Sequence, residues 1–171
     1  ARYLSMVMAQ VRDLQATSAG GGPIVLMQAE NRWYCHNPDQ EQKYLREIVR
    51  YLRENGCSVP MIVSNNLWQR VEGTLDAWSG SEHLTANLRQ LRLIQPDAPR
   101  LVSGCWSGHA DQWGAPHQVD RSASHLSHCL AQILAAGGQY NLEMFHGGTN
   151  VGFLAGRTAA GPANFIATTY D

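Results

Sequence analysis

Apolar residues recur every three or four positions in four segments of the chain, and a short, mostly apolar run follows each segment. The first helical pattern covers Tyr3 to Leu14 and ends before three consecutive glycines. Ile24 to Ala29 then forms a short apolar run bounded by Pro23 and by polar residues, which indicates a buried strand. The chain therefore opens with a helix followed by a strand.

The same alternation continues to residue 145. A second helix is predicted over Glu41 to Glu54, with Gly56 as its C-terminal cap. A third is predicted over a leucine-rich segment that Ser81 could cap, and a fourth over Ser122 to Ala136. The strands between and after them are predicted at Val59 to Ser64, Thr74 to Trp78, Leu101 to Trp106 and Tyr140 to Phe145. Apolar strands separated by amphipathic helices are typical of parallel βαβ units. The sequence thus predicts an α/β fold.

Periodicity leaves two α/β architectures open, a barrel and an open doubly wound sheet. The open sheet is expected to carry a glycine-rich phosphate-binding turn after its first strand, yet Glu30 to Trp33 occupy that position. We therefore predict a barrel, in which the working residues gather at the C-terminal ends of the strands.

Composition narrows the classes of partner. The 171 residues are 44% hydrophobic and 16% charged, with a net charge of -1, which suits one globular domain and offers no basic field for nucleic acid or an anionic membrane. No apolar run approaches the roughly 20 residues that cross a bilayer. Four scattered cysteines indicate neither a disulfide framework nor a zinc ribbon. Because the chain begins with Ala1, we expect a fragment, and we assign it no compartment.

The residues that follow the predicted strands are polar and aromatic. They are Glu30, Asn31, Arg32, Trp33, Asn65, Asn66, Trp68, Asp76, Trp78, Trp106, His109, Asp111, Trp113, Glu143, His146, Thr149 and Asn150. Indole rings stack on the apolar faces of sugars, and carboxylates and amides bind sugar hydroxyls, so this set favours a saccharide cleft.

Several motifs in a fixed order resemble glycoside hydrolase family 35, the β-galactosidases. The matching segments are Gly21 to Ile24, Gln28 to Asn31, Trp106 to Gly108 with Asp111 and Trp113, Phe145 to Phe153, and Thr168 to Asp171. The resemblance covers essentially the whole chain as one partial barrel domain, residues 1–171. It implies the fourth to eighth strands of a (β/α)8 TIM barrel, since a full barrel takes about 250 residues.

The resemblance also implies a substrate and partners. A terminal β-galactoside or related saccharide would bind the cleft through Glu30, Asn31, Trp106, His109 and Glu143. No cofactor and no metal are implied. The remaining barrel strands and downstream β domains would lie elsewhere in the full-length protein, for which the resemblance allows a secreted or periplasmic location.

Both catalytic carboxylates of the family are replaced in this chain. Retaining enzymes need two carboxyl groups about 5 to 5.5 Å apart, one as acid and base and the other as nucleophile. The family's acid/base glutamate corresponds to Arg32, which cannot exchange a proton near neutral pH. Its nucleophile corresponds to Gly104, which has no side chain. We therefore expect catalytic impairment, that is, a pseudoenzyme.

Two further substitutions fall at the same mouth, since His109 replaces a tryptophan and Glu143 replaces a tyrosine of the family pattern. Three hypotheses stay open. The barrel is non-catalytic and binds saccharide, or it is a structural module plugged by its own side chains, or it is an active glycosidase in which Glu143 with Glu30 or Asp111 forms a new carboxylate pair.

Other candidate groups have simpler interpretations. His146 is expected to be a hydrogen-bonding anchor, Cys105 a buried hydrophobe and not a nucleophile, and His125 with His128 an exposed pair and not a metal site.

Arg32 and Glu143 are predicted to contact each other directly or through water. If the first strand stays extended through Arg32, its side chain points to the same side as Glu30, toward the mouth. A cation and an anion in one partly desolvated cavity are tolerated best as a pair.

Overall fold

The structure is a computed structural model of the chain. It describes residues 2–33, 35–66, 70–108, 111–113, 122–144, 148–149 and 165–169. The elements, in chain order, are α1 (Arg2–Val11), the 3-10 turn η1 (Arg12–Leu14), β1 (Met27–Asn31), α2 (Pro38–Glu54), β2 (Met61–Ser64), β3 (Leu75–Asp76), β4 (Trp78–Ser79), α3 (Leu84–Ile94), β5 (Leu101–Cys105), β6 (Asp111–Gln112), α4 (Ala123–Ala135), β7 (Gln139–Leu142), β8 (Gly148–Thr149) and β9 (Ile166–Thr169).

The strands that alternate with helices pair in parallel, as predicted. One sheet has the order β1-β2-β3 and another the order β4-β5-β7, and each neighbouring pair is parallel. Only Ala77 separates β3 from β4, and its amide donates to the carbonyl of Val63 at 3.0 Å. The two sheets therefore meet at Ala77, and the α/β class with parallel sheets is confirmed.

The first strand begins three residues later than the pattern predicts. Ile24 forms an isolated bridge with Gln15, its amide donates to Leu14 at 3.0 Å, and its carbonyl accepts from Ala16 at 2.8 Å. These bonds pair Ile24 with residues 14–16 and not with a neighbouring strand, and β1 starts at Met27. The last of the predicted strands, Tyr140 to Phe145, is β7, which ends at Leu142, and Phe145 lies outside the described residues.

Capping explains where the helices begin and end. The side chain of Asn37 accepts from Gln40 ahead of Pro38, so α2 starts three residues earlier than predicted. The Ser122 side chain accepts from the amide of His125 and caps α4, which agrees with the predicted start of this helix at Ser122. The predicted cap at Ser81 is wrong, because α3 starts after His83, which has a left-handed backbone (φ 51°).

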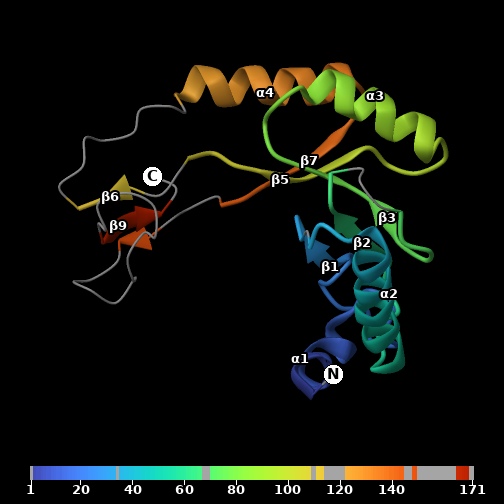
Figure 1. The fold of residues 1–171 in the computed structure, drawn as a ribbon. Coiled ribbons are helices and arrows are strands. Elements are labelled where there is room, and N and C mark those ends of the chain that lie inside the picture. Colours follow the sequence, from blue (N-terminus) through green and yellow to red (C-terminus); the bar gives the residue numbers. More distant parts are fainter. Residues whose placement is uncertain are drawn as a thin grey trace.

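Two separate apolar cores support the sheets. The first joins α1 and α2 to β2 and consists of Met8, Leu45, Val49, Leu52, Cys57, Val59, Met61, Val63 and Val71. The second joins α3 and α4 to β5 and consists of Leu84, Leu88, Leu91, Val102, Cys105, Cys129 and Ile133. In Figure 1, α3 and α4 lie together along β5 and β7, whereas α2 stands against β1 and β2.

The apolar stripe of α1 is buried only in part. Met8 is fully buried, whereas Tyr3 is 77% exposed and Leu14 is 48% exposed. The predicted stripe thus packs against α2 and the first core through Met8, while its ends, Tyr3 in α1 and Leu14 in η1, stay largely exposed.

A small antiparallel sheet near the C-terminus was not predicted from the sequence. β9 pairs with β6 on one side and with β8 on the other. Its strands are too short for a clear alternation of apolar and polar residues.

All four cysteines carry free thiols, and Cys105 is fully buried, as expected of a hydrophobe. Within the described ranges, no helix has the length and apolarity that a bilayer-spanning segment requires.

Candidate functional site

The C-terminal ends of β4, β5 and β7 are tied to one another by backbone bonds. The Gly80 amide donates to the Gly104 carbonyl at 2.9 Å, and the Glu143 amide donates to the Cys105 carbonyl at 2.9 Å. The Ser107 hydroxyl donates to the Met144 carbonyl at 2.8 Å. These bonds fix the backbone at Gly104 and Glu143, two positions of the predicted mouth.

Gly104 lies in a space that two neighbouring side chains already occupy. A Cβ atom at this buried glycine would lie 2.6 Å from Ser79 Oγ and 3.1 Å from Glu143 Oε2. Ser79 is its partner in the ladder between β4 and β5. The structure thus brings Glu143 to Gly104, while Ser79 is a site residue that the sequence analysis missed.

Arg32 stacks on Trp106 instead of pairing with Glu143. Its guanidinium carbon lies 5.1 Å from the centre of the Trp106 ring, a geometry that favours a cation–π interaction. β1 ends at Asn31, and Arg32 has a left-handed backbone (φ 54°), so the alternation of side chains does not extend to it.

The predicted direct contact between Arg32 and Glu143 is therefore wrong. The ion pairs among the described residues join Arg12 to Asp13 and Arg50 to Glu47 and Glu54. A water-bridged contact stays a prediction.

Glu30 is held by the helix that follows its strand. Its carboxylate accepts from the Tyr44 hydroxyl at 2.6 Å and from the Asn31 amide at 2.9 Å. The bond to the Glu30 carboxylate, with a smaller contribution from burial, raises the pKa of Tyr44 to about 12. The rings of Trp33 and Tyr44 lie 4.2 Å apart between centroids, which fixes the phenol beside Glu30.

A chain of polar side chains crosses the interior between the strands. Gln28 Nε2 donates to Ser64 Oγ at 3.0 Å, and Ser64 Oγ lies 2.6 Å from Ser103 Oγ. Ser103 Oγ in turn donates to the Trp78 carbonyl at 3.3 Å. Both serines are buried. The only sequence signal for this row of hydrogen-bonded side chains was a serine inside each of two apolar strands.

Asn65 and Asn66, two of the polar residues that follow the predicted strands, form hydrogen bonds to the backbone. Asn65 Oδ1 accepts from the Trp33 amide at 3.3 Å, and Asn66 Oδ1 accepts from the Ser79 amide at 2.9 Å. Close by, Trp78 Nε1 and Ser79 Oγ are buried and lack a hydrogen-bond partner within the described part of the chain. Buried polar atoms of this kind are uncommon in folded proteins.

Several predicted site residues cannot be compared with the structure. Trp68, His109, His146 and Asn150 lie outside the described residues, and Asp111 is described only as a backbone position of β6. His125 and His128 are exposed on α4, and no group of three metal-ligating residues occurs among the positions that the structure describes.

The amino-acid sequence is similar to a known protein family and to several known proteins. The model of the family "Glycosyl hydrolases family 35" matches residues 1–171. The chain is 32% identical over 176 residues to human "Beta-galactosidase-1-like protein 2", with 99% of this chain and 27% of the relative covered. It is 30% identical over 174 residues to human "Beta-galactosidase-1-like protein 3", covering 99% and 26%.

Mouse "Beta-galactosidase" is 30% identical over 181 residues, covering 99% of this chain and 27% of the relative. The chain thus spans about a quarter of the length of these relatives. From the match of the family model over all of its residues, this chain belongs to glycosyl hydrolase family 35.

Proposed function

We propose that this chain is part of a family 35 barrel domain that keeps a saccharide-facing cleft but does not hydrolyse β-galactosides by the retaining mechanism. The observation that carries the proposal is the surroundings of Gly104, the position that corresponds to the family's nucleophile. Ser79 Oγ and Glu143 Oε2 stand 2.6 and 3.1 Å from where its Cβ would be. No side chain at residue 104 can attack a sugar.

The acid/base position supports the same proposal. Arg32 corresponds to the family's proton donor, and a guanidinium stays protonated throughout the physiological range. Its position over Trp106 covers a ring face on which a sugar would otherwise stack. General acid help and covalent catalysis would both be lost, and general acid–base help alone contributes about 10² to 10⁴ in rate.

The strand order supports a partial barrel. Among the described strands, β1 pairs only with β2 and β7 only with β5, so each keeps one free edge. An apolar cavity of about 250 Å³ is lined by Ile62, Leu75 and Leu101, on β2, β3 and β5, so this part of the strands is not filled by side chains.

Free edges and exposed apolar residues predict association. Val25 is 68% exposed and Tyr140 is 41% exposed, at or just before the two edge strands. Sedimentation velocity should therefore detect concentration-dependent association of the 171-residue chain. A monodisperse monomer at all concentrations would contradict the partial barrel.

A second candidate function rests on Glu143 itself. Its carboxylate has moved next to the place that the nucleophile's side chain would occupy, which is what a relocated nucleophile requires. Of its possible partners, Glu30 is bound to Tyr44 and Asn31 and is not free to approach a substrate without breaking these bonds. This argues against a pair of Glu143 with Glu30, whereas a pair with Asp111, which the structure describes only as a backbone position, stays a prediction.

The experiment that tests the proposal measures release of a chromophore from an aryl β-galactoside. We expect no turnover by the unaltered protein and none by Gly104→Glu alone, because Arg32 still cannot protonate the leaving group. The triple variant Arg32→Glu, Gly104→Glu, Glu143→Tyr restores the family's residues at three of the four substituted positions, including both catalytic ones, and any recovered turnover should appear there first. Turnover by the unaltered protein that Glu143→Gln abolishes would establish the relocated carboxylate and overturn the proposal.

A titration with galactose and lactose, followed by tryptophan fluorescence, separates the two non-catalytic hypotheses. Saturable quenching supports a saccharide-binding cleft. The absence of any change, together with a gain of binding in Arg32→Ala, supports a cleft plugged by its own side chains.

A further inference from the structure

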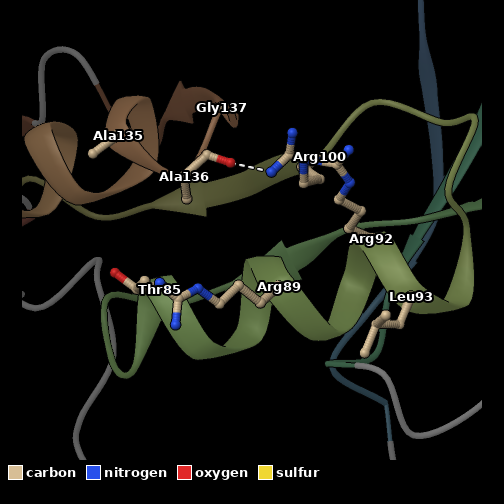
Figure 2. Close-up of a pocket in the computed structure, with 8 residues that line it drawn as sticks. All are labelled: Thr85, Arg89, Arg92, Leu93, Arg100, Ala135, Ala136 and Gly137. Carbon is tan, nitrogen blue, oxygen red and sulfur yellow. Dashed lines mark hydrogen bonds between the residues drawn. The ribbon is translucent and has the colours of Figure 1, made fainter.

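A cavity lined by three arginines lies on the helical side of the second core. It has a volume of about 660 Å³ and is bordered by α3, by the C-terminal end of α4 and by Arg100, which precedes β5. Figure 2 shows Arg89 and Arg92 projecting from α3 and Arg100 reaching the end of α4. The cavity is at the N-terminal ends of β5 and β7, opposite the end where Gly104 and Glu143 lie.

Arg100 has a structural role and also retains free donors. Its Nη1 donates to the Ala136 carbonyl at the end of α4, and its guanidinium packs where Gly137 lacks a side chain. This contact offsets the negative end of the α4 dipole, which would otherwise repel an anion. A guanidinium carries five N–H donors, so Arg100 can bind a further acceptor.

Arg89 and Arg92 have no acceptor at all within the described part of the chain. They stand one turn apart on α3, and neither side chain forms a hydrogen bond or an ion pair with a described residue. Arg50 on α2 provides the contrast, because it forms ion pairs of 2.6 Å with both Glu47 and Glu54. Among the described residues no carboxylate lines the arginine cavity, so none of them there compensates its three positive charges, in a chain whose net charge is -1.

We propose that this cavity is a binding site for a tetrahedral oxyanion, that is, the phosphate or sulfate group of a ligand. Guanidinium groups bind such groups through paired, charge-assisted hydrogen bonds. Figure 2 shows Arg92 directed toward Arg100, while Arg89 extends along α3 toward Thr85. A dianion with four oxygens can accept from Arg92 and Arg100 together and keeps oxygens for a further donor, whereas a carboxylate has only two oxygens. The Thr85 side chain, which also borders the cavity, offers a further hydroxyl donor. The proposal is independent of catalysis at the other end of the strands.

Calorimetric titration with sodium phosphate and sodium sulfate, against sodium chloride at matched ionic strength, tests the site. We expect saturable binding of a dianion, weakened at least about tenfold in the double variant Arg89→Gln, Arg92→Gln. Both residues are exposed on α3, so the fold should persist, which circular dichroism checks. The matched control is Lys43→Gln, Arg46→Gln, which removes the same charge from the exposed face of α2 and should leave the affinity within about twofold.

The pH dependence distinguishes the two ligand groups. A phosphate ester loses its second charge near a pKa of about 6, and the inorganic phosphate used as the probe does so at a somewhat higher pH. The affinity for phosphate should therefore fall between about pH 7.5 and 5.5, while that for sulfate should not. Binding of one anion only would identify the ester class and still support the site. The proposal is overturned if no heat saturates, or if both double variants weaken binding equally, since that would mean a general charge effect.

Discussion

Glu143 Oε2 lies 3.1 Å from the position that a Cβ atom would take at Gly104. The space beside Gly104, which has no side chain, is therefore shared with the Glu143 carboxylate at the ends of β5 and β7. The carboxylate fills part of the volume that a longer residue at 104 would need, with Ser79 filling the rest.

Gly104→Ala should destabilise the protein by about 1–3 kcal/mol, because the new methyl group is forced against Ser79 Oγ. The double variant Ser79→Ala, Gly104→Ala should recover most of this loss, since the Cβ of Ser79 lies at an ordinary 3.5 Å. Ser79→Ala alone should be neutral or stabilising by up to about 1 kcal/mol, because it removes a buried hydroxyl without a partner among the described residues. Urea unfolding measures all three. Additive effects of the two substitutions would contradict the steric explanation.

Arg32 and Trp106 should be energetically coupled. A double-mutant cycle with Arg32→Ala and Trp106→Leu should give an interaction free energy of about 0.5–1 kcal/mol in urea unfolding, the range of an exposed cation–π pair. Arg46→Ala combined with Trp106→Leu is the control, since Arg46 is on the exposed surface of α2. Coupling as large in the control cycle would show that the Arg32 contact is not its source.

Tyr44 should stay protonated well above the ordinary phenol range, because its pKa is raised to about 12 by the bond to Glu30. The pKa is higher in the folded state, so its stabilising contribution is complete below about pH 10 and is lost as the pH rises toward 12. The difference in stability between the unaltered protein and Tyr44→Phe should therefore shrink over this interval. Absorbance at high pH and chemical unfolding measure the two effects, with Tyr3→Phe, at a position 77% exposed, as the control. A difference that is constant with pH would be contrary to this expectation.

Asp76→Asn should stabilise the protein at pH 7. Burial raises the pKa of the Asp76 carboxyl, and Arg70 offsets this only in part. The folded pKa exceeds the unfolded one, so the stability due to the neutral form is complete below about pH 3.9 and is lost as the pH rises through the folded pKa. The gain from the amide should thus decline as the pH is lowered toward 4. Asp97→Asn, at an exposed position, is the control, and a loss of stability at pH 7 would mean that the ionised form is needed.

The sequence alone determined the order of elements and most of their type. The strands β2 and β5 were mostly apolar runs between two amphipathic patterns, so their type could be predicted. The single strand predicted from Thr74 to Trp78 is instead two short strands, β3 and β4. Ser122 and Gly56 marked a helix start and a helix end because capping depends on near neighbours in the chain. The start of β1 was predicted three residues too early, because the bonds of Ile24 join it to residues before the three glycines, and local sequence does not show this pairing.

Only the tertiary structure decided which mouth residues meet. Period-two alternation assigned Arg32 to the side of Glu30, but a left-handed backbone at Arg32 ended the strand and turned the guanidinium onto Trp106. Ser79 carried no signal of its own, because its closeness to Gly104 arises from the pairing of β4 with β5. The arginine cavity likewise joins α3, α4 and the start of β5, which are separate in sequence. Local sequence patterns indicate which residues are candidates for a site. The distances between these residues depend on how segments that are far apart in the sequence pack together.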